Sequence, residues 1–428
     1  MVFNGGGIMN KNRILLYAPV LTRSGYGEQS RFALRALRSR PDLFDIFIQP
    51  LEWGNTSWIT DDTEERRFID QMIEKTIIHV QNNGGFDSSL QVTIPNEWNP
   101  IHPRNIGYTA GMETTRIDAA WIEPSNKMDK IIVVSNHSKN VYESTVYEQE
   151  VEGTNDKRRY MVTTPIDAVG YPVKKFENAE VPDLSLDTDY NFLCVAQMGP
   201  RKNIDSTIKW FIDEFKDDAD VGLVLKTNFA KNCQVDREVC HGRVLGIVNQ
   251  YPDKKCKIYL LHGDMTDEEL HGIYKHPKIS AALSCTHGEG FGLPLFEAAY
   301  MGAPVVAPGW SGQLDFLCDE NGKSHFYNIS FDIQPIPENV VWQNVIPAGS
   351  MWCYPRENSA RQQMRQCIDD VKKGTAQAAA SQYAAQLQER FDEQALYHQF
   401  IEALGIDFNE EELDVENWLA ELDIEEIE

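Results

Sequence analysis

Short apolar runs alternate with segments of helical periodicity along the first half of the chain. The apolar runs have strand length, and polar loops separate them from the amphipathic segments that follow. The strands predicted here cover about 13–18, 44–50, 90–94, 105–109 and 130–135, and the helices about 28–37, 66–78, 116–123 and 137–147. Strands that alternate with helices predict a parallel sheet that is covered on both faces.

The same pattern starts again after a polar segment at 181–190, which we interpret as a hinge. The second set has strands at about 191–196, 221–226, 257–261, 279–284 and 304–307, a helix at 204–215 and a last helix at about 376–404. The fold class is therefore α/β, with two Rossmann-like domains that face a cleft. Ligands of open parallel sheets bind at the carboxyl ends of the strands, so a site is expected in that cleft.

Composition narrows the class of protein. The chain has 428 residues, of which 42% are hydrophobic and 25% charged, as in an ordinary globular enzyme. No apolar run reaches the roughly 20 residues that span a bilayer, and the first ten residues lack a secretory signal, so we expect a cytoplasmic protein without a transmembrane segment. None of the eight cysteines forms a CxxC pair, which indicates scattered reduced thiols rather than a metal site.

The net charge of −25 is unevenly distributed, because residues 407–428 hold eleven carboxylates and no lysine or arginine. An acidic chain argues against non-specific nucleic-acid binding, which needs clustered cations, although a local basic cleft stays open. Within this tail Leu413, Trp418, Leu422 and Ile427 recur at roughly helical spacing. The tail is either an amphipathic segment that docks on the body or on a partner, or a solvated disordered one.

The most informative segment is THGEGFGLPLFE at 286–297, which follows a predicted strand and leads into a helix. Its three glycines allow close approach of the backbone to a ligand, and amides at the helix N-terminus favour a phosphate. Pro294 suits the first turn of that helix. Glu289 and Glu297 flank the turn, and their carboxylates are natural acceptors for sugar hydroxyls.

The string EGFGLPLFE, followed by AAYMG and APVV, resembles the retaining glycosyltransferases of GT-B fold, in the large family commonly numbered four. The likeness is strong over about 190–310 and weaker in the first half. It implies that Glu297 binds the nucleotide ribose of a sugar donor and that Glu289 lies beside the donor sugar. The turn residues Gly290, Phe291, Gly292 and Leu293 would complete the donor site.

A second match to this family is GPRKN at 199–203, after the first strand of the second domain. Relatives use cations here to neutralise the donor diphosphate, which implies that role for Lys202 and Arg201. A nucleoside diphosphate gains negative charge as it leaves, so fixed cations stabilise the transition state. Lys226, at the end of the next strand, is a third candidate.

Candidates in the first half are less specific. Gly25 and Gly27, in a loop between a strand and a helix, correspond to the family's glycine loop near the diphosphate and acceptor. The segment 107–116 occupies the place where relatives present a histidine, which this segment lacks. The candidate contacts to acceptor or sugar are Glu113, Thr114, Arg116 and His137.

The resemblance implies transfer of a sugar from a UDP- or GDP-type donor to an acceptor hydroxyl of a glycan or glycolipid, with retention. It implies an acceptor domain at 1–180, a donor domain at 181–385 and a helix at 386–405 that crosses back. The charge distribution adds an acidic tail at 406–428. We expect no cofactor besides the donor and no metal, since no strand-end loop carries an Asp-x-Asp motif. The alternatives are a phage-type enzyme acting on modified DNA bases, a non-catalytic nucleotide-sugar-binding protein, and a phosphorylase or sugar-nucleotide epimerase.

Overall fold

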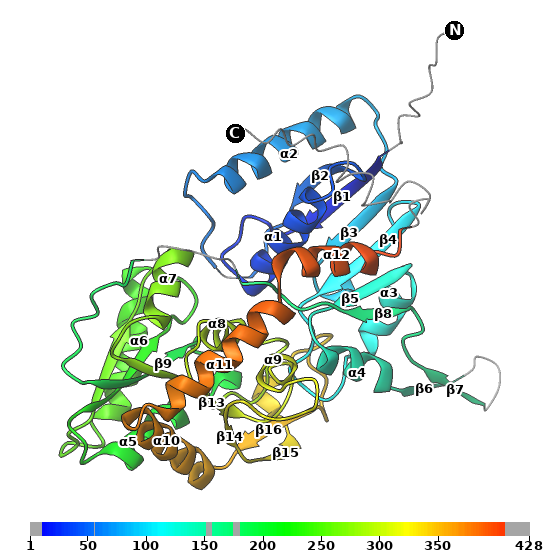
Figure 1. Ribbon diagram of the computed structural model, residues 1–428. Helices are drawn as coiled ribbons and strands as arrows, with labels where there is room; N and C mark the ends of the chain where they lie inside the picture. The colour runs from blue at the N-terminus through cyan, green and yellow to red at the C-terminus, as the bar shows by residue number, and fades with distance from the viewer. Residues whose placement is uncertain (1–10, 55, 151–155, 174–179, 407–428) are drawn as a thin grey trace, which may run out of the picture.

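The computed structural model describes residues 11–54, 56–150, 156–173 and 180–406, so the acidic tail at 407–428 lies outside the described residues. Two six-stranded parallel sheets form the body of the molecule (Figure 1), which confirms the α/β class. No helix in these described ranges has the length and apolar character needed to cross a membrane.

The first sheet has the strand order β2-β1-β3-β4-β5-β8. Its strands are β1 Asn12–Ala18, β2 Phe44–Pro50, β3 Ser88–Val92, β4 Arg104–Thr109, β5 Lys130–Val133 and β8 Ile166–Ala168. The helices of this half are α1 Gly25–Arg38, α2 Glu64–Gln81, α3 Ile122–Asn126 and α4 Asn136–Ser144. Its central strands have no exposed side chains at Ile14, Leu90 and Ile106, as expected for a sheet with helices on both faces.

The second sheet has the order β11-β10-β9-β12-β13-β14. Its strands are β9 Tyr190–Val195, β10 Val221–Lys226, β11 Lys257–Leu261, β12 Ile279–Leu283, β13 Val305–Pro308 and β14 Tyr327–Ile329. The helices here are α5 Ile204–Phe215, α6 Gln234–Val248, α7 Asp267–Tyr274, α8 Leu293–Tyr300, α9 Leu314–Leu317 and α10 Glu357–Lys372. In both sheets the order reverses at the first strand, where the carboxyl ends of neighbouring strands diverge and leave room for a ligand.

Two hairpins that the sequence patterns did not predict extend from the sheets. One pairs β6 Tyr147–Glu150 with β7 Lys157–Tyr160, and the other pairs β15 Phe331–Pro335 with β16 Met351–Pro355. The second hairpin reaches the first domain, where Thr115 donates its backbone N–H to Met351 O at 3.0 Å. The predicted helix at 116–123 is also wrong, because a 3-10 turn, η2 Ala119–Trp121, precedes the short α3.

The prediction of one last helix at 376–404 is wrong as well. The structure has two helices, α11 Thr375–Arg390 and α12 Glu393–Ala403. Asp392 separates them because its carboxylate accepts the backbone N–H groups of Gln394 and Ala395, at 3.0 and 3.1 Å. These bonds cap the start of α12 and end the preceding helix.

Helix α12 lies on the first domain, although the elements before it belong to the second (Figure 1). The ring of Phe400 packs against Phe32 of α1 at 5.2 Å and against Tyr108 of β4 at 5.1 Å between centroids. Arg104 donates to the backbone oxygen of Leu404 at 3.2 Å. The end of the described chain is thereby built into the core of the first domain.

Candidate active site

A cleft of about 680 Å³ lies between the two sheets. The start of α1 forms one wall, and the ends of β9 and β10 with the start of α8 form the other. Five of the residues singled out in the sequence line it: Gly25, Lys202, Lys226, Leu293 and Glu297. The volume and position are those of a ligand site in an open parallel fold.

The turn before α8 requires glycine at one position. Gly292 has a φ of +100°, a left-handed conformation that other residues rarely adopt, and it stands immediately before the helix. Pro294 occupies the first turn, as predicted. Leu293, the first residue of α8, lines the cleft, and its backbone N–H at the helix N-terminus suits an anion.

Glu289 forms the centre of a buried ion-pair cluster. Its carboxylate accepts from Lys202 Nζ at 2.6 and 2.8 Å and from Arg201 Nη1 at 3.0 Å, and Glu289 is 7% exposed. Arg201 also pairs with Glu113 of the first domain at 3.3 Å. Burial opposes ionisation of Glu289, but Lys202 and Arg201 outweigh it and lower its pKa to about 2.

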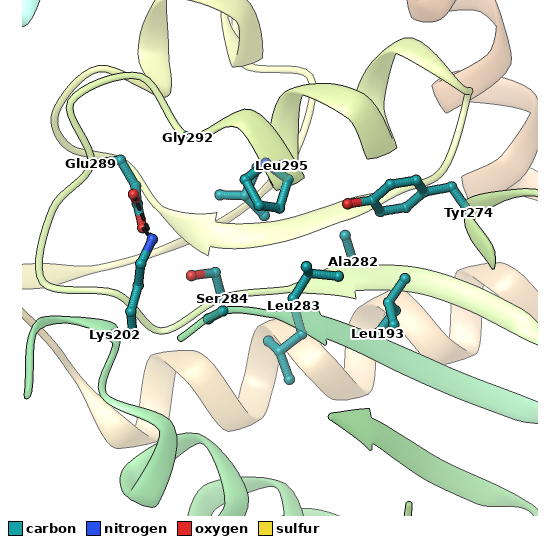
Figure 2. Close-up of a pocket in the computed structure, with 12 residues that line it drawn as sticks. Leu193, Lys202, Tyr274, Ala282, Leu283, Ser284, Glu289, Gly292 and Leu295 are labelled. Carbon is teal, nitrogen blue, oxygen red and sulfur yellow. Dashed lines mark hydrogen bonds and ion pairs between the residues drawn. The ribbon is translucent and has the colours of Figure 1, made fainter. Parts of the chain in front are cut away.

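Figure 2 shows this pairing at one end of a small pocket under the turn, with Lys202 and Glu289 pointing toward each other. Tyr274 lies at the opposite end of the pocket. Lys202 lines both this pocket and the larger cleft, so its ammonium lies where the two meet. The predicted trio of Glu289, Lys202 and Arg201 is thus brought together.

Glu297 lies in the second turn of α8 and lines the larger cleft. It accepts a hydrogen bond from Tyr274 Oη at 3.1 Å. Burial raises the pKa of Glu297 to about 8, and the negative charges of Asp267 and Glu28 add to this effect, against the Tyr274 hydrogen bond. At neutral pH a large share of this carboxyl is therefore protonated and can donate as well as accept.

Lys226 and the glycine loop complete the walls. Lys226 Nζ donates to Gly263 O at 2.7 Å at the end of β10. Gly25 has open space where a side chain would begin, whereas a Cβ at Gly27 would lie 1.9 Å from Thr22 O. Gly27 is therefore needed for packing of α1 against the preceding turn, and its backbone N–H donates to the capping Ser24 Oγ at 2.9 Å.

The two domains touch beside Glu289. A Cβ at Gly290 would lie 2.3 Å from Ala110 O of the first domain, so glycine permits this close approach. Ser135 Oγ donates to Gly290 O at 2.6 Å and also caps α4. Asn136 at the start of α4 donates its backbone N–H to Asp315 of the second domain at 2.7 Å.

Four predicted contacts point elsewhere than the cleft. The Phe291 ring is 4% exposed and packs against Tyr171, so its side chain belongs to the core and its backbone alone can face a donor. Thr114 is 2% exposed and donates to Arg116 O at 3.2 Å. The Arg116 guanidinium lies over the Tyr147 ring at 4.6 Å from its centroid.

His137, the fourth, packs edge-on against Trp310 at 5.0 Å between ring centroids. Burial lowers the pKa of His137 to about 4, which leaves the imidazole neutral at physiological pH. Tyr274, Ser135 and Asp315 are partners of the site that sequence reasoning did not assign to it. Their roles depend on contacts between distant parts of the chain, for which the sequence gives no local signal.

One cluster in the described part of the chain has side chains suited to a metal. Asp236, Cys240 and His262 offer ligand atoms within 4.8 Å of one another. Asp236 already accepts the backbone N–H groups of residues 229, 230 and 231 at 2.6 to 2.8 Å, and His262 Nε2 lies 2.9 Å away. The carboxylate thus anchors the loop after β10, and this loop borders the cleft through Asn228 and Asn232.

Solved structures of similar shape define the fold. Sucrose-phosphate synthase from Thermosynechococcus elongatus matches at 13% identity with a TM-score of 0.59, over 92% of this chain and 98% of that one. A structure described as trehalose-6-phosphate from E. coli bound with UDP-2-fluoro glucose matches at 9% identity with a TM-score of 0.54, over 92% and 99%. An OtsA apo structure matches at 8% identity with a TM-score of 0.55, over 93% and 100%.

Structures of TarM also match, one of them S. aureus TarM in complex with UDP, at 14% identity with a TM-score of 0.47. That match covers 74% of this chain and 55% of TarM, so this chain spans about half the length of TarM. No protein-family model and no curated protein matches the sequence. The chain has the GT-B fold, with two Rossmann-like sheets around a cleft. Membership of the family numbered four stays a prediction.

Proposed function

We propose that the protein is a glycosyltransferase that moves a sugar from a nucleoside-diphosphate sugar, of UDP or GDP type, to an acceptor hydroxyl with retention. The observation that carries this proposal is the cluster of Glu289, Lys202 and Arg201 beside the start of α8, where the cleft meets the turn. Lys202, Arg201 and the N-terminus of α8 can bind a diphosphate, and the carboxylate of Glu289 can accept hydrogen bonds from sugar hydroxyls.

In this proposal the donor nucleotide lies along the second domain. Glu297 binds the ribose hydroxyls, and its mixed protonation lets it both donate and accept. Lys226 lies at the end of β10 and faces the phosphates or the base. The amides of Gly292 and Leu293, with Lys202 and Arg201, hold the diphosphate as it gains charge.

The acceptor approaches from the first domain and attacks the sugar on the face that the diphosphate leaves. The new bond joins the acceptor oxygen to the anomeric carbon, the bond from that carbon to the phosphate oxygen breaks, and the leaving phosphate takes the acceptor proton. Lys202 and Arg201 stabilise the leaving group, and Glu113 lies next to them at the first-domain side.

We infer a glycan or glycolipid as the acceptor, a cytoplasmic location, and a reaction that needs neither metal nor cofactor. The side chains of Lys202 and Arg201 can neutralise the diphosphate in place of a metal ion, which supports a metal-independent reaction. Full activity in a chelator would support it, and restoration of a chelator-treated enzyme by a divalent cation would contradict it.

The test is a thermal-shift panel with UDP-, GDP-, ADP- and TDP-sugars, on the wild type, on Glu297→Ala and on a control, Glu238→Ala, from the exposed face of α6. Selective stabilisation by one nucleotide sugar, lost in Glu297→Ala and kept in the control, supports the donor site. No stabilisation by any of them, against a sound melting curve, would refute it. Binding without transfer or donor hydrolysis would instead favour a non-catalytic sugar-nucleotide-binding protein.

A further inference from the structure

Strand β11 is an open edge of the second sheet. It has β10 as its neighbour on one side and ends the strand order. Each of its residues is at least partly exposed, in contrast to the buried β12. A groove of about 390 Å³ follows this edge, and apart from His241 its lining is apolar or aromatic: Leu184, Leu186, Val224, Val244, Leu245, Val248, Ile258, Tyr259, Leu260 and Leu261.

The groove has one wall on each face of the sheet. Val244 and Val248 of α6 line it on the side toward which Ile258 and Leu260 pack. Leu184 and Leu186, from the segment between the domains, line it on the side of Tyr259 and Leu261. The backbone edge of β11 thus lies at the bottom of an apolar channel.

In the first sheet, helix α2 covers the corresponding edge strand, β2, whereas β11 has no such cover among the described residues. Thr76 of α2 accepts the backbone N–H of Ile48 at 2.8 Å, and Lys75 donates to Ile46 O at 2.9 Å, so α2 closes the edge of β2. Within the described ranges, no side chain forms a hydrogen bond to a backbone group of β11. An unpaired strand edge is a template for another strand.

The groove has a basic end. Lys254 and Lys255 lie just before β11, separated from it by Cys256, and Lys257 is its first residue. None of the three forms an ion pair with a described residue, and Asp253 is the one acidic residue among 253–257. The segment that fits this channel therefore has alternating apolar residues and negative charge.

The chain itself contains such a segment. Residues 412–416 read ELDVE and residues 421–425 read ELDIE, so acidic and aliphatic residues alternate strictly in both. This period of two places the aliphatic side chains on one face of an extended strand and the carboxylates on the other. The surrounding 407–428 contains eleven carboxylates and no cation.

We propose that the acidic segment 407–428 adds to β11 as an extra strand through one of these two pentapeptides. Its aliphatic side chains fill the α6 side of the groove beside Leu245 and Val248, and its carboxylates lie on the opposite face of the sheet, which is also the face of Lys257 by the alternation of β11. Backbone pairing supplies affinity, and the alternating pockets supply specificity. This pairing extends the sheet that holds the donor site, because β11 leads directly into Gly263 and Met265 of the cleft wall.

The test is hydrogen–deuterium exchange of the full chain, without donor, read on peptides covering β11. Two double variants each remove the aliphatic side chains of one pentapeptide. Leu413→Ser with Val415→Ser changes 412–416, and Leu422→Ser with Ile424→Ser changes 421–425. One of them is expected to speed exchange of the β11 amides at least tenfold, since they lose a strand partner. Equal β11 exchange in the wild type and both variants would overturn the proposal.

A groove variant tests the same pairing from the other side. Leu245→Glu, at a residue that is 43% exposed, places a negative charge in the channel and is expected to speed exchange as the tail variant does. Its control is Val235→Glu on the same helix, 74% exposed and outside the groove lining, which leaves exchange unchanged. Fast exchange in the control alone would contradict the assigned surface. Protection that grows with protein concentration and accompanies dimers still supports the pairing, with the segment supplied by a second copy.

Discussion

At the residue scale, Glu289 forms ion pairs with the two cations that would bind a diphosphate in the proposed function. Lys202 and Arg201 both bond to its carboxylate, at distances of 2.6 to 3.0 Å. A donor diphosphate therefore competes with Glu289 for the same two cations. Glu289 would set the balance between tight binding of the leaving nucleotide and its release after transfer.

Replacing Glu289 by glutamine is expected to tighten binding of the free nucleoside diphosphate about tenfold, which corresponds to about 1.4 kcal/mol. The variant keeps the side-chain shape but leaves Lys202 and Arg201 without their anionic partner. Calorimetric titration with UDP and GDP measures the affinity, and a transfer assay is expected to show loss of activity. Lys202→Met is the control with the opposite expectation, because loss of this cation should weaken binding of the nucleoside diphosphate. Weaker nucleotide binding by Glu289→Gln would contradict this account.

Glu297 is the other carboxyl of the motif. Its environment raises its pKa, whereas the environment of Glu289 lowers the pKa of that residue. Burial raises its pKa to about 8, well above the value of roughly 4.3 in an unfolded chain. Between these values the folded protein binds more protons than the unfolded one. The contribution of Glu297 to stability is therefore present at low pH and is lost as the pH rises toward 8.

Urea unfolding between pH 5 and pH 9 tests this linkage. The free energy of unfolding is expected to fall with rising pH, with a contribution from Glu297 of at most about 1.4 kcal/mol per pH unit. Glu297→Gln should remove that contribution. Tyr274→Phe, which deletes a hydrogen bond that lowers the pKa, should move the fall to higher pH. Identical pH profiles for the wild type and Glu297→Gln would exclude a raised pKa.

At the element scale, helix α4 begins at the contact between the domains. Its first N–H, on Asn136, donates to the carboxylate of Asp315 from the other domain at 2.7 Å, in addition to the cap provided by Ser135 within the chain. An anion at a helix N-terminus is stabilising, because the first amides have no partner within the helix. The helix thereby acts as a link between the two domains.

Asp315→Ala is expected to lower the free energy of unfolding by about 1 kcal/mol, as the loss of a capping group does. Chemical denaturation gives the value, and exchange of the α4 amides should rise in parallel. Glu143→Gln, in the last turn of the same helix, is a control without loss of stability. If Asp315→Ala unfolds like the wild type, the contact contributes nothing to domain pairing.

The elements also show what could be predicted from the sequence. Helix α5 and strands β10 and β11 have the predicted bounds, because each is a short apolar or amphipathic run between clear polar breaks. The hairpin of β15 and β16 was not predicted because its two strands are short and stand far apart in the chain, at 331–335 and 351–355, without a tight turn between them. The break at Asp392 was overlooked because the apolar stripe of α12 continues the spacing of α11. In the site, the turn and its carboxylates followed from one motif, whereas the bond between Asp315 and Asn136 joins positions 179 residues apart.

At the scale of the whole molecule, the domains meet partly through closely packed backbone, in addition to the ion pair between Arg201 and Glu113. The turn at Gly290 fits against Ala110 of the first domain, and Ser135 bonds to the same glycine. This contact lies next to Glu289, which is 7% exposed, whereas the cleft that Lys226 and Glu297 line stays open. In the proposed function, the domain pair is closed at the sugar end and accessible at the nucleotide end.

Gly290→Ala is expected to separate the domains, since its Cβ would lie 2.3 Å from Ala110 O. Small-angle scattering should show a larger radius of gyration, and transfer should fall at least tenfold while the second domain still binds nucleotide. Gly242→Ala on α6, where a Cβ meets no atom within 4 Å, is the matched control. An unchanged radius with full transfer would show that the contact yields to a methyl group.

The placement of α12 also determines when the first domain can be completed during synthesis. Phe32 and Tyr108, both in the first domain, pack against Phe400, which comes much later in the chain. A nascent chain that has emerged as far as the hinge therefore exposes the apolar surface that α12 will cover. That surface stays uncovered on the ribosome until the second domain has been translated, so the first domain depends on α12 for protection from aggregation.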